Sequence, residues 1–154
     1  MKLSLQLQYA VCGVFDLAYN GHGDPVQIRV ISERQGIPAR YLEQIFQRLR
    51  RARLVQSKRG PGGGYTLARR PAEITLRDVV EAIEGPLDGR GTKTRGGVGV
   101  DKPTATSYRP SFLWPVLSQS IAEVLAHTNL EAMCRDAQRS SVRRAHSDPH
   151  MYFI

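Results

Sequence analysis

The chain has 154 residues, which fits one domain or one domain with an added helical arm. Apolar residues make up 41% of it, enough for a hydrophobic core, so wholesale disorder is excluded. The net charge of +8 is concentrated between Arg34 and Arg70, where there are ten basic residues and one acidic residue, Glu43. Such a local positive field favours polyanions, either nucleic acid or an acidic membrane surface; the alternative is a basic face that serves solubility alone.

The first apolar stretch does not have the form of a signal peptide. Residues 9–17 are interrupted by Asp16, and no small-residue cleavage site follows. No run reaches the roughly 18 apolar residues that a membrane span needs. We therefore expect a cytoplasmic protein without a membrane partner. Cys12 and Cys134 have no metal-ligand spacing, and in a reducing compartment we expect no disulfide. The histidines likewise predict no metal site: His22, His127, His146 and His150.

Apolar spacing predicts three helices in the first third of the chain. They cover residues 3–20, 27–35 and 38–52. Gly36 provides a tight turn between the second and third helices, which together have the helix-turn-helix pattern. The apolar face of the third helix follows the spacing i, i+3, i+4, i+7: Leu42, Ile45, Phe46 and Leu49. The other face consists of Ala39, Arg40, Glu43, Gln44, Gln47 and Arg51.

A basic β-hairpin follows the third helix directly. The residue pattern of Leu54–Lys58 alternates in the way that is typical of a strand. A tight glycine-rich loop follows at Arg59–Gly64, and Tyr65–Ala68 is predicted to return as a second strand. A hairpin at this place is typical of the wing of a winged helix-turn-helix domain. The loop does not fit a nucleotide-binding P-loop, because no Lys-Ser/Thr pair follows it and it leads into a strand. We expect Tyr65 to pack at the base of the wing.

A fourth helix is predicted after the wing. Thr75 is its expected N-cap, Asp78 forms an imperfect capping box three residues later, and Gly85-Pro86 ends it. Residues 85–110 have almost no large apolar side chains and predict a flexible loop.

A helical arm is predicted beyond this loop, over residues 111–127, with a long apolar stripe. The stripe consists of Leu113, Trp114, Leu117, Ile121, Val124 and Leu125. It predicts a dimerisation interface, and the alternative is that it docks on the chain's own core. The predicted organisation is a winged helix-turn-helix domain over 1–84, the loop over 85–110, the dimerisation helix and a short terminal helix over 111–138, and a disordered basic tail over 139–154. The fold class is mainly α with a small β-hairpin wing.

The candidate DNA contacts lie on the third helix and in the wing. A helix fits the major groove, and side chains in its N-terminal half reach base edges. Glu43 is suited to accept a hydrogen bond from a cytosine amino group, although it can equally pair with Arg40 or Gln47 along the helix. Gln44 is suited to form hydrogen bonds with the major-groove edge of adenine. In the wing, glycines let the backbone approach DNA closely while basic side chains meet phosphates or a narrow minor groove. The predicted contacts are Arg40, Tyr41, Glu43, Gln44 and Gln47 on the helix and Lys58, Arg59, Gly60 and Gly62 in the wing.

Four motifs carry a family resemblance: residues 31–37 (ISERQGI), 41–46 (YLEQIF), 49–52 (LRRA) and 59–65 (RGPGGGY). With Trp114-x-x-Leu117-Ser118 and Ile121, they resemble the IscR/NsrR/CymR-type regulators (the Rrf-two family) from Met1 to about Leu130. The resemblance implies a homodimeric repressor or activator that reads a palindromic operator with the third helix and the wing. By that likeness, the DNA contacts are Arg40, Tyr41, Glu43, Gln44, Arg59, Gly60 and Gly62.

The chain departs from this family in its sensor loop. Many members hold an iron–sulfur cluster with three cysteines in this loop, and some also with a histidine. Residues 85–110 contain no cysteine, and Ser111 takes the place of the histidine. Because such clusters are built on thiolates, we expect no iron–sulfur cofactor. We then expect that the sensing input is lost, or that it is replaced by a regulatory protein or a small effector.

Two other functional classes remain for comparison. A protein-interaction module of the same fold, controlled by a partner, would no longer read DNA specifically; it predicts a degraded recognition helix and wing, and both are intact here. An enzyme is not expected, because no nucleophile–base pair, carboxylate dyad or nucleotide loop emerges from the sequence.

Overall fold

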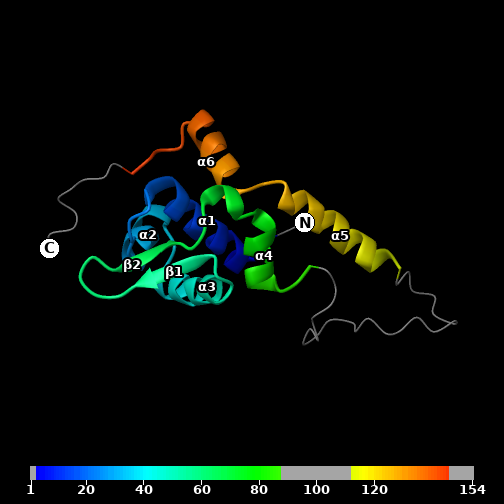
Figure 1. Cartoon of the computed structure of the whole chain (residues 1–154), viewed down its shortest axis with the longest axis horizontal. Coiled ribbons are helices and arrows are strands. Elements are labelled where there is room, and N and C mark those ends of the chain that lie inside the picture. Colours follow the sequence, from blue (N-terminus) through cyan, green and yellow to red (C-terminus); the bar gives the residue numbers. More distant parts are fainter. Residues whose placement is uncertain (1–2, 88–111, 146–154) are drawn as a thin grey trace.

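The computed structural model describes residues 3–87 and 112–145 (Figure 1). They form six helices, a two-stranded hairpin and a short 3-10 turn: α1 (Leu5–Asn20), α2 (Ile28–Gln35), α3 (Ala39–Arg51), β1 (Val55–Lys58), β2 (Gly64–Leu67), η1 (Pro71–Glu73), α4 (Leu76–Glu84), α5 (Leu113–Ala126) and α6 (Leu130–Arg139). This architecture confirms the predicted fold class. Within the described part of the chain, every helix is too short or too polar to cross a membrane.

Helix α1 is the centre of the domain. The Ser4 hydroxyl accepts a hydrogen bond from the Leu7 amide at 3.1 Å and so caps its first turn. Helices α2, α3, α4 and α6 all pack against α1. The buried residues of α1 include Leu7, Ala10, Val14 and Leu17. Cys12 lies among the apolar positions of this helix, where a buried packing residue is expected, but it is only half-buried and packs against the edge of the core.

The helix-turn-helix is formed by α2 and α3. Gly36 ends α2 in the left-handed conformation, with φ of 64°. Two hydrogen bonds then close the turn: the Ile37 amide donates to the Ser32 carbonyl at 3.1 Å, and the Ser32 hydroxyl donates to the Ile37 carbonyl at 2.6 Å. The four apolar residues predicted for the inner face of α3 are all buried: Leu42, Ile45, Phe46 and Leu49.

The remaining elements join the arm to the domain. Thr75 caps α4, and both bonds of the capping box with Asp78 are present, so the box is better formed than we predicted. The segment before α4 pairs with the α5–α6 junction: the Leu76 amide donates to the Thr128 carbonyl at 2.8 Å, and the Leu130 amide donates to the Ile74 carbonyl at 2.9 Å. Helix α5 then extends away from the domain (Figure 1).

The start of the predicted tail differs in the structure. Arg139 is the last residue of α6, and Ser141 turns the chain back with φ of 56°. Residues 142–145, called here the C-terminal strap, are hydrogen-bonded to the end of α1. Each of these bonds joins a side chain to a backbone group, and the backbone groups leave no pattern in the sequence. The rest of the predicted tail, and residues 88–110 of the predicted loop, lie outside the described residues.

Candidate nucleic-acid interface

The outer face of α3 carries the five predicted base-reading residues. All five side chains are exposed: Arg40, Tyr41, Glu43, Gln44 and Gln47. They are exposed because the opposite face of the same helix is buried against α1 and α4, and helical periodicity separates the two faces. Tyr41 is partly supported by the ring of Tyr9, whose centroid lies 6.4 Å away. The structure therefore presents these side chains together on one accessible ridge.

Glu43 is the acidic residue on this ridge. Among the described residues, its carboxylate makes no ion pair and no hydrogen bond, so the alternative pairing with Arg40 or Gln47 is not formed. A carboxylate near the phosphates of DNA is unfavourable unless it accepts a hydrogen bond there. Its open position is suited to a cytosine amino group.

The tip of the wing is a tight turn. The Gly63 amide donates to the Gly60 carbonyl at 2.9 Å, Pro61 occupies the second position, and Gly62 has φ of 68°. Proline followed by a residue with positive φ is the arrangement of a type II turn, which explains the glycine at position 62. The four predicted wing contacts are all exposed: Lys58, Arg59, Gly60 and Gly62.

The wing is held beside α3 through its base. Tyr65 on β2 exchanges two backbone hydrogen bonds with Val26, at 2.8 and 2.9 Å. Its ring meets the ring of Phe46 of α3 edge-on, with centroids 4.9 Å apart, which confirms that Tyr65 packs at the base of the wing. A guanidinium nitrogen of Arg50 also donates to the Ser57 hydroxyl at 3.2 Å. Helix α3 and the hairpin therefore lie side by side (Figure 1).

Three exposed arginines near the junction of α3 and the wing were not among the predicted DNA contacts. Arg50, Arg51 and Arg53 lie between the two predicted contact regions, and that position in the sequence is the signal that would have found them. Arg48 is different, because its guanidinium donates to the Gln6 side chain at 3.1 Å and to the Ile83 carbonyl at 3.5 Å. Residues 39–60 contain seven basic residues and one acidic residue, all of them exposed. The surface is strongly positive and suits a polyanion.

The predicted stripe on α5 separates into two parts. Leu113 and Leu125 are half-buried, and α5 packs against α4. The other four residues are exposed: Trp114 (53%), Leu117 (43%), Ile121 (42%) and Val124 (71%). Their spacing of three, four and three residues is that of a coiled-coil seam. The chain's own core therefore covers only the smaller part of the stripe.

The two cysteines lie on different helices, Cys12 on α1 and Cys134 on α6. Burial raises the pKa of both thiols, which disfavours the thiolate form that binds metals. Residues 3–87 and 112–145 contain no group of three or more histidine, cysteine or acidic side chains placed to hold a metal ion.

Comparison with known proteins agrees with this geometry. Residues 3–136 match the family model described as "Rrf2: Iron-dependent Transcriptional regulator". The chain is 36% identical over 152 residues to the HTH-type transcriptional regulator IscR of Cronobacter sakazakii. This match covers 97% of this chain and 91% of that protein. It is 39% identical over 142 residues to IscR of Aliivibrio salmonicida, and this match covers 92% of this chain and 82% of that protein.

Solved structures give the same result. T. potens IscR has a TM-score of 0.70 and 33% identity, with 95% of both chains covered. CymR, the global cysteine regulator of B. subtilis, has a TM-score of 0.66 and 30% identity, with 88% of this chain and 97% of that chain covered. The resemblance seen in the sequence is confirmed: the chain belongs to the Rrf2 family and is a DNA-binding transcription regulator of the winged helix-turn-helix type, not an enzyme.

Proposed function

We propose that the chain acts as a homodimer on a palindromic operator, with α3 of each copy in the major groove and the wing beside it. The observation that carries this proposal is the basic surface of α3 and the hairpin, where all nine predicted DNA contacts are exposed. A dimer with two-fold symmetry requires a palindromic site, because each copy reads one half. The exposed seam on α5 supports the dimer.

Within this proposal, Glu43 reads a base and Arg59 binds phosphate. We expect Glu43→Ala to lower the preference for one base pair in each half-site by the amount of one specific base contact, about 1–3 kcal/mol. The same change should raise affinity for random DNA, because it removes a negative charge from a surface that faces phosphates. The measurement is selection of binding sequences from a random double-stranded pool, followed by titrations of the selected operator and of random DNA.

Arg59→Ala is the matched control. It should weaken binding to the operator and to random DNA alike. Because the dimer loses one phosphate contact from each copy, the slope of log affinity against log salt should also become less steep by about 1.8, at about 0.9 per contact. An unchanged set of selected sequences for Glu43→Ala would contradict base reading by this residue. A loss confined to the operator would contradict the phosphate role of Arg59.

We also propose that DNA binding here does not depend on an iron–sulfur cluster. A cluster held by three cysteines does not suit a chain that has two, both with raised thiol pKa values and on separate helices. Protein purified without oxygen should be colourless and free of iron and sulfide, and should still bind the selected operator. A brown protein with stoichiometric iron and sulfide would contradict this. The signal would then come from a regulatory protein or a small effector.

A further inference from the structure

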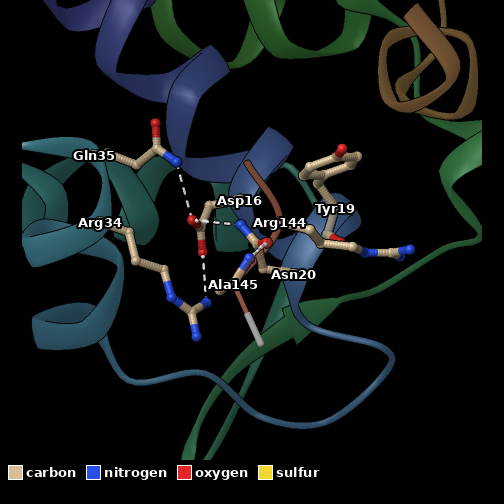
Figure 2. A network of polar contacts seen from close by, with 7 residues as sticks. All are labelled: Asp16, Tyr19, Asn20, Arg34, Gln35, Arg144 and Ala145. Carbon is tan, nitrogen blue, oxygen red and sulfur yellow. Dashed lines mark hydrogen bonds and ion pairs between the residues drawn. The ribbon is translucent and has the colours of Figure 1, made fainter. Parts of the chain in front are cut away.

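A buried carboxylate lies where α1 meets the end of α2. Asp16 has no exposed surface, and its oxygens accept three hydrogen bonds: from Asn20 Nδ2 at 3.0 Å, Arg34 Nη1 at 3.2 Å and Gln35 Nε2 at 2.9 Å (Figure 2). A buried charge is tolerated only when it is paired and hydrogen-bonded in this way. Because removing any partner is costly, the positions of all three donors are tightly defined.

Two of these donors belong to the helix-turn-helix. Arg34 and Gln35 form the last turn of α2, immediately before Gly36 and the turn into α3. Asp16 therefore determines where the end of α2 lies on α1, and with it the start of the recognition helix. This contact is independent of the packing of Phe46, which holds the middle of α3 against α1.

The third donor connects to the C-terminal strap. Asn20 donates through Nδ2 to Asp16 and accepts through Oδ1 from the Ala145 amide at 2.8 Å (Figure 2). Both ends of its side-chain amide are used, and a flipped amide would satisfy neither partner, so its orientation is defined. The Arg144 Nε donates to the Tyr19 carbonyl at 2.9 Å, and its guanidinium lies 5.2 Å from the Tyr19 ring centroid. The Tyr19 hydroxyl donates to the Val142 carbonyl at 3.0 Å.

A continuous chain of hydrogen bonds therefore runs from the strap through Asn20 and Asp16 to the last turn of α2. We propose that the strap, acting through Asn20, positions the helix-turn-helix for reading its operator. Asn20 and Arg144 are positioning residues in this role, far along the sequence from every predicted DNA contact. The inference rests on the proposed function, because it concerns how well α3 is placed in the groove.

Arg144→Ala in the full chain tests this, with Arg143→Ala as its matched control. The two changes remove the same charge from neighbouring exposed positions. Of these two side chains, only that of Arg144 makes a hydrogen bond to α1 among the described residues. We expect Arg144→Ala and Asn20→Ala each to lower the ratio of operator affinity to random-DNA affinity by about tenfold, within the usual range of coupling between two sites. The double variant should lose little more than either single one, because both break the same connection.

Amide hydrogen exchange of residues 34–41 is the second measurement. It should become faster in Arg144→Ala and Asn20→Ala and stay unchanged in Arg143→Ala. A strap that only adds stability would lower the melting temperature and leave the affinity ratio of the folded protein unchanged, and that result would overturn the proposal. An equal effect of Arg143→Ala would overturn it too. A wild-type chain without any operator preference would instead refute the proposed function, and the exchange data would still show whether the strap is connected to α2.

Discussion

Replacing Phe46 by alanine is expected to lower the free energy of unfolding by about 3–5 kcal/mol, the usual cost of removing a buried phenyl ring. The ring is fully buried, lies against Gly13 of α1 and meets Tyr65 of the wing edge-on. It thus joins three elements, and its loss leaves a cavity where they meet. Urea denaturation measures the change, and Phe46→Leu should give a smaller loss of the same sign in a folded protein.

Gly13 provides the decisive control for this prediction. A Cβ at position 13 would lie 2.7 Å from Phe46 Cε2, so Gly13→Ala alone should destabilise the protein by overpacking. In the Phe46→Ala background the same methyl group enters the cavity, and alanine is also the better helix former. The cost of Gly13→Ala should therefore vanish or reverse in the double variant. Additive effects of the two changes would contradict the close contact between α1 and α3.

Replacing Ile121 by lysine is expected to dissociate the proposed dimer and weaken operator binding by about 100-fold or more, the scale on which linked binding sites reinforce each other. Ile121 lies in the exposed seam of α5, and a buried lysine there would lose its hydration without a partner. Because the new charge is positive, it cannot weaken DNA binding by direct repulsion. Sedimentation equilibrium and titration with the full palindrome measure the two effects.

Gln119→Lys is the control on the same helix. It adds the same charge at an exposed position outside the seam, where Gln119 bonds only to Glu123 at 2.8 Å among the described residues. It should leave the oligomeric state and the affinity for the palindrome unchanged. An Ile121→Lys variant that stays dimeric would refute the seam as the interface. A monomer that binds the palindrome as well as wild type would refute the need for a dimer.

The parts of the fold that follow from local pattern could be predicted from the sequence. The inner face of α3, the N-cap at Thr75 and the glycine-rich turn of the wing all depend on neighbours within a few positions. The exposed position of the candidate DNA contacts follows from the same periodicity. The assignment of these side chains to DNA contact stays a prediction; what the structure shows is that they are exposed on α3 and the wing.

The polar connection around Asp16 could not be predicted in this way. In the sequence, Asp16 only interrupts an apolar stretch, which indicates a solvent-facing residue rather than a buried one. Its partners Arg34 and Gln35 are 18 and 19 positions away, and the strap binds more than 120 positions away. The strap bonds also use the carbonyl of Tyr19 and the amide of Ala145. Every residue but proline has both groups, so composition carries no signal.

The pairing of residues 74–76 with residues 128–130 has a consequence for the spacing of DNA half-sites. These backbone bonds hold the base of α5, whose 14 residues make a rod about 21 Å long. A tilt of about 10° at the base moves the far end of such a rod by about 4 Å, close to the 3.4 Å rise of one base pair. In the proposed dimer, the distance between the two copies of α3 therefore depends on this short bridge, together with the packing of α5 against α4. Substitutions there would change which operator length is accepted, and leave the bases read within each half unaltered.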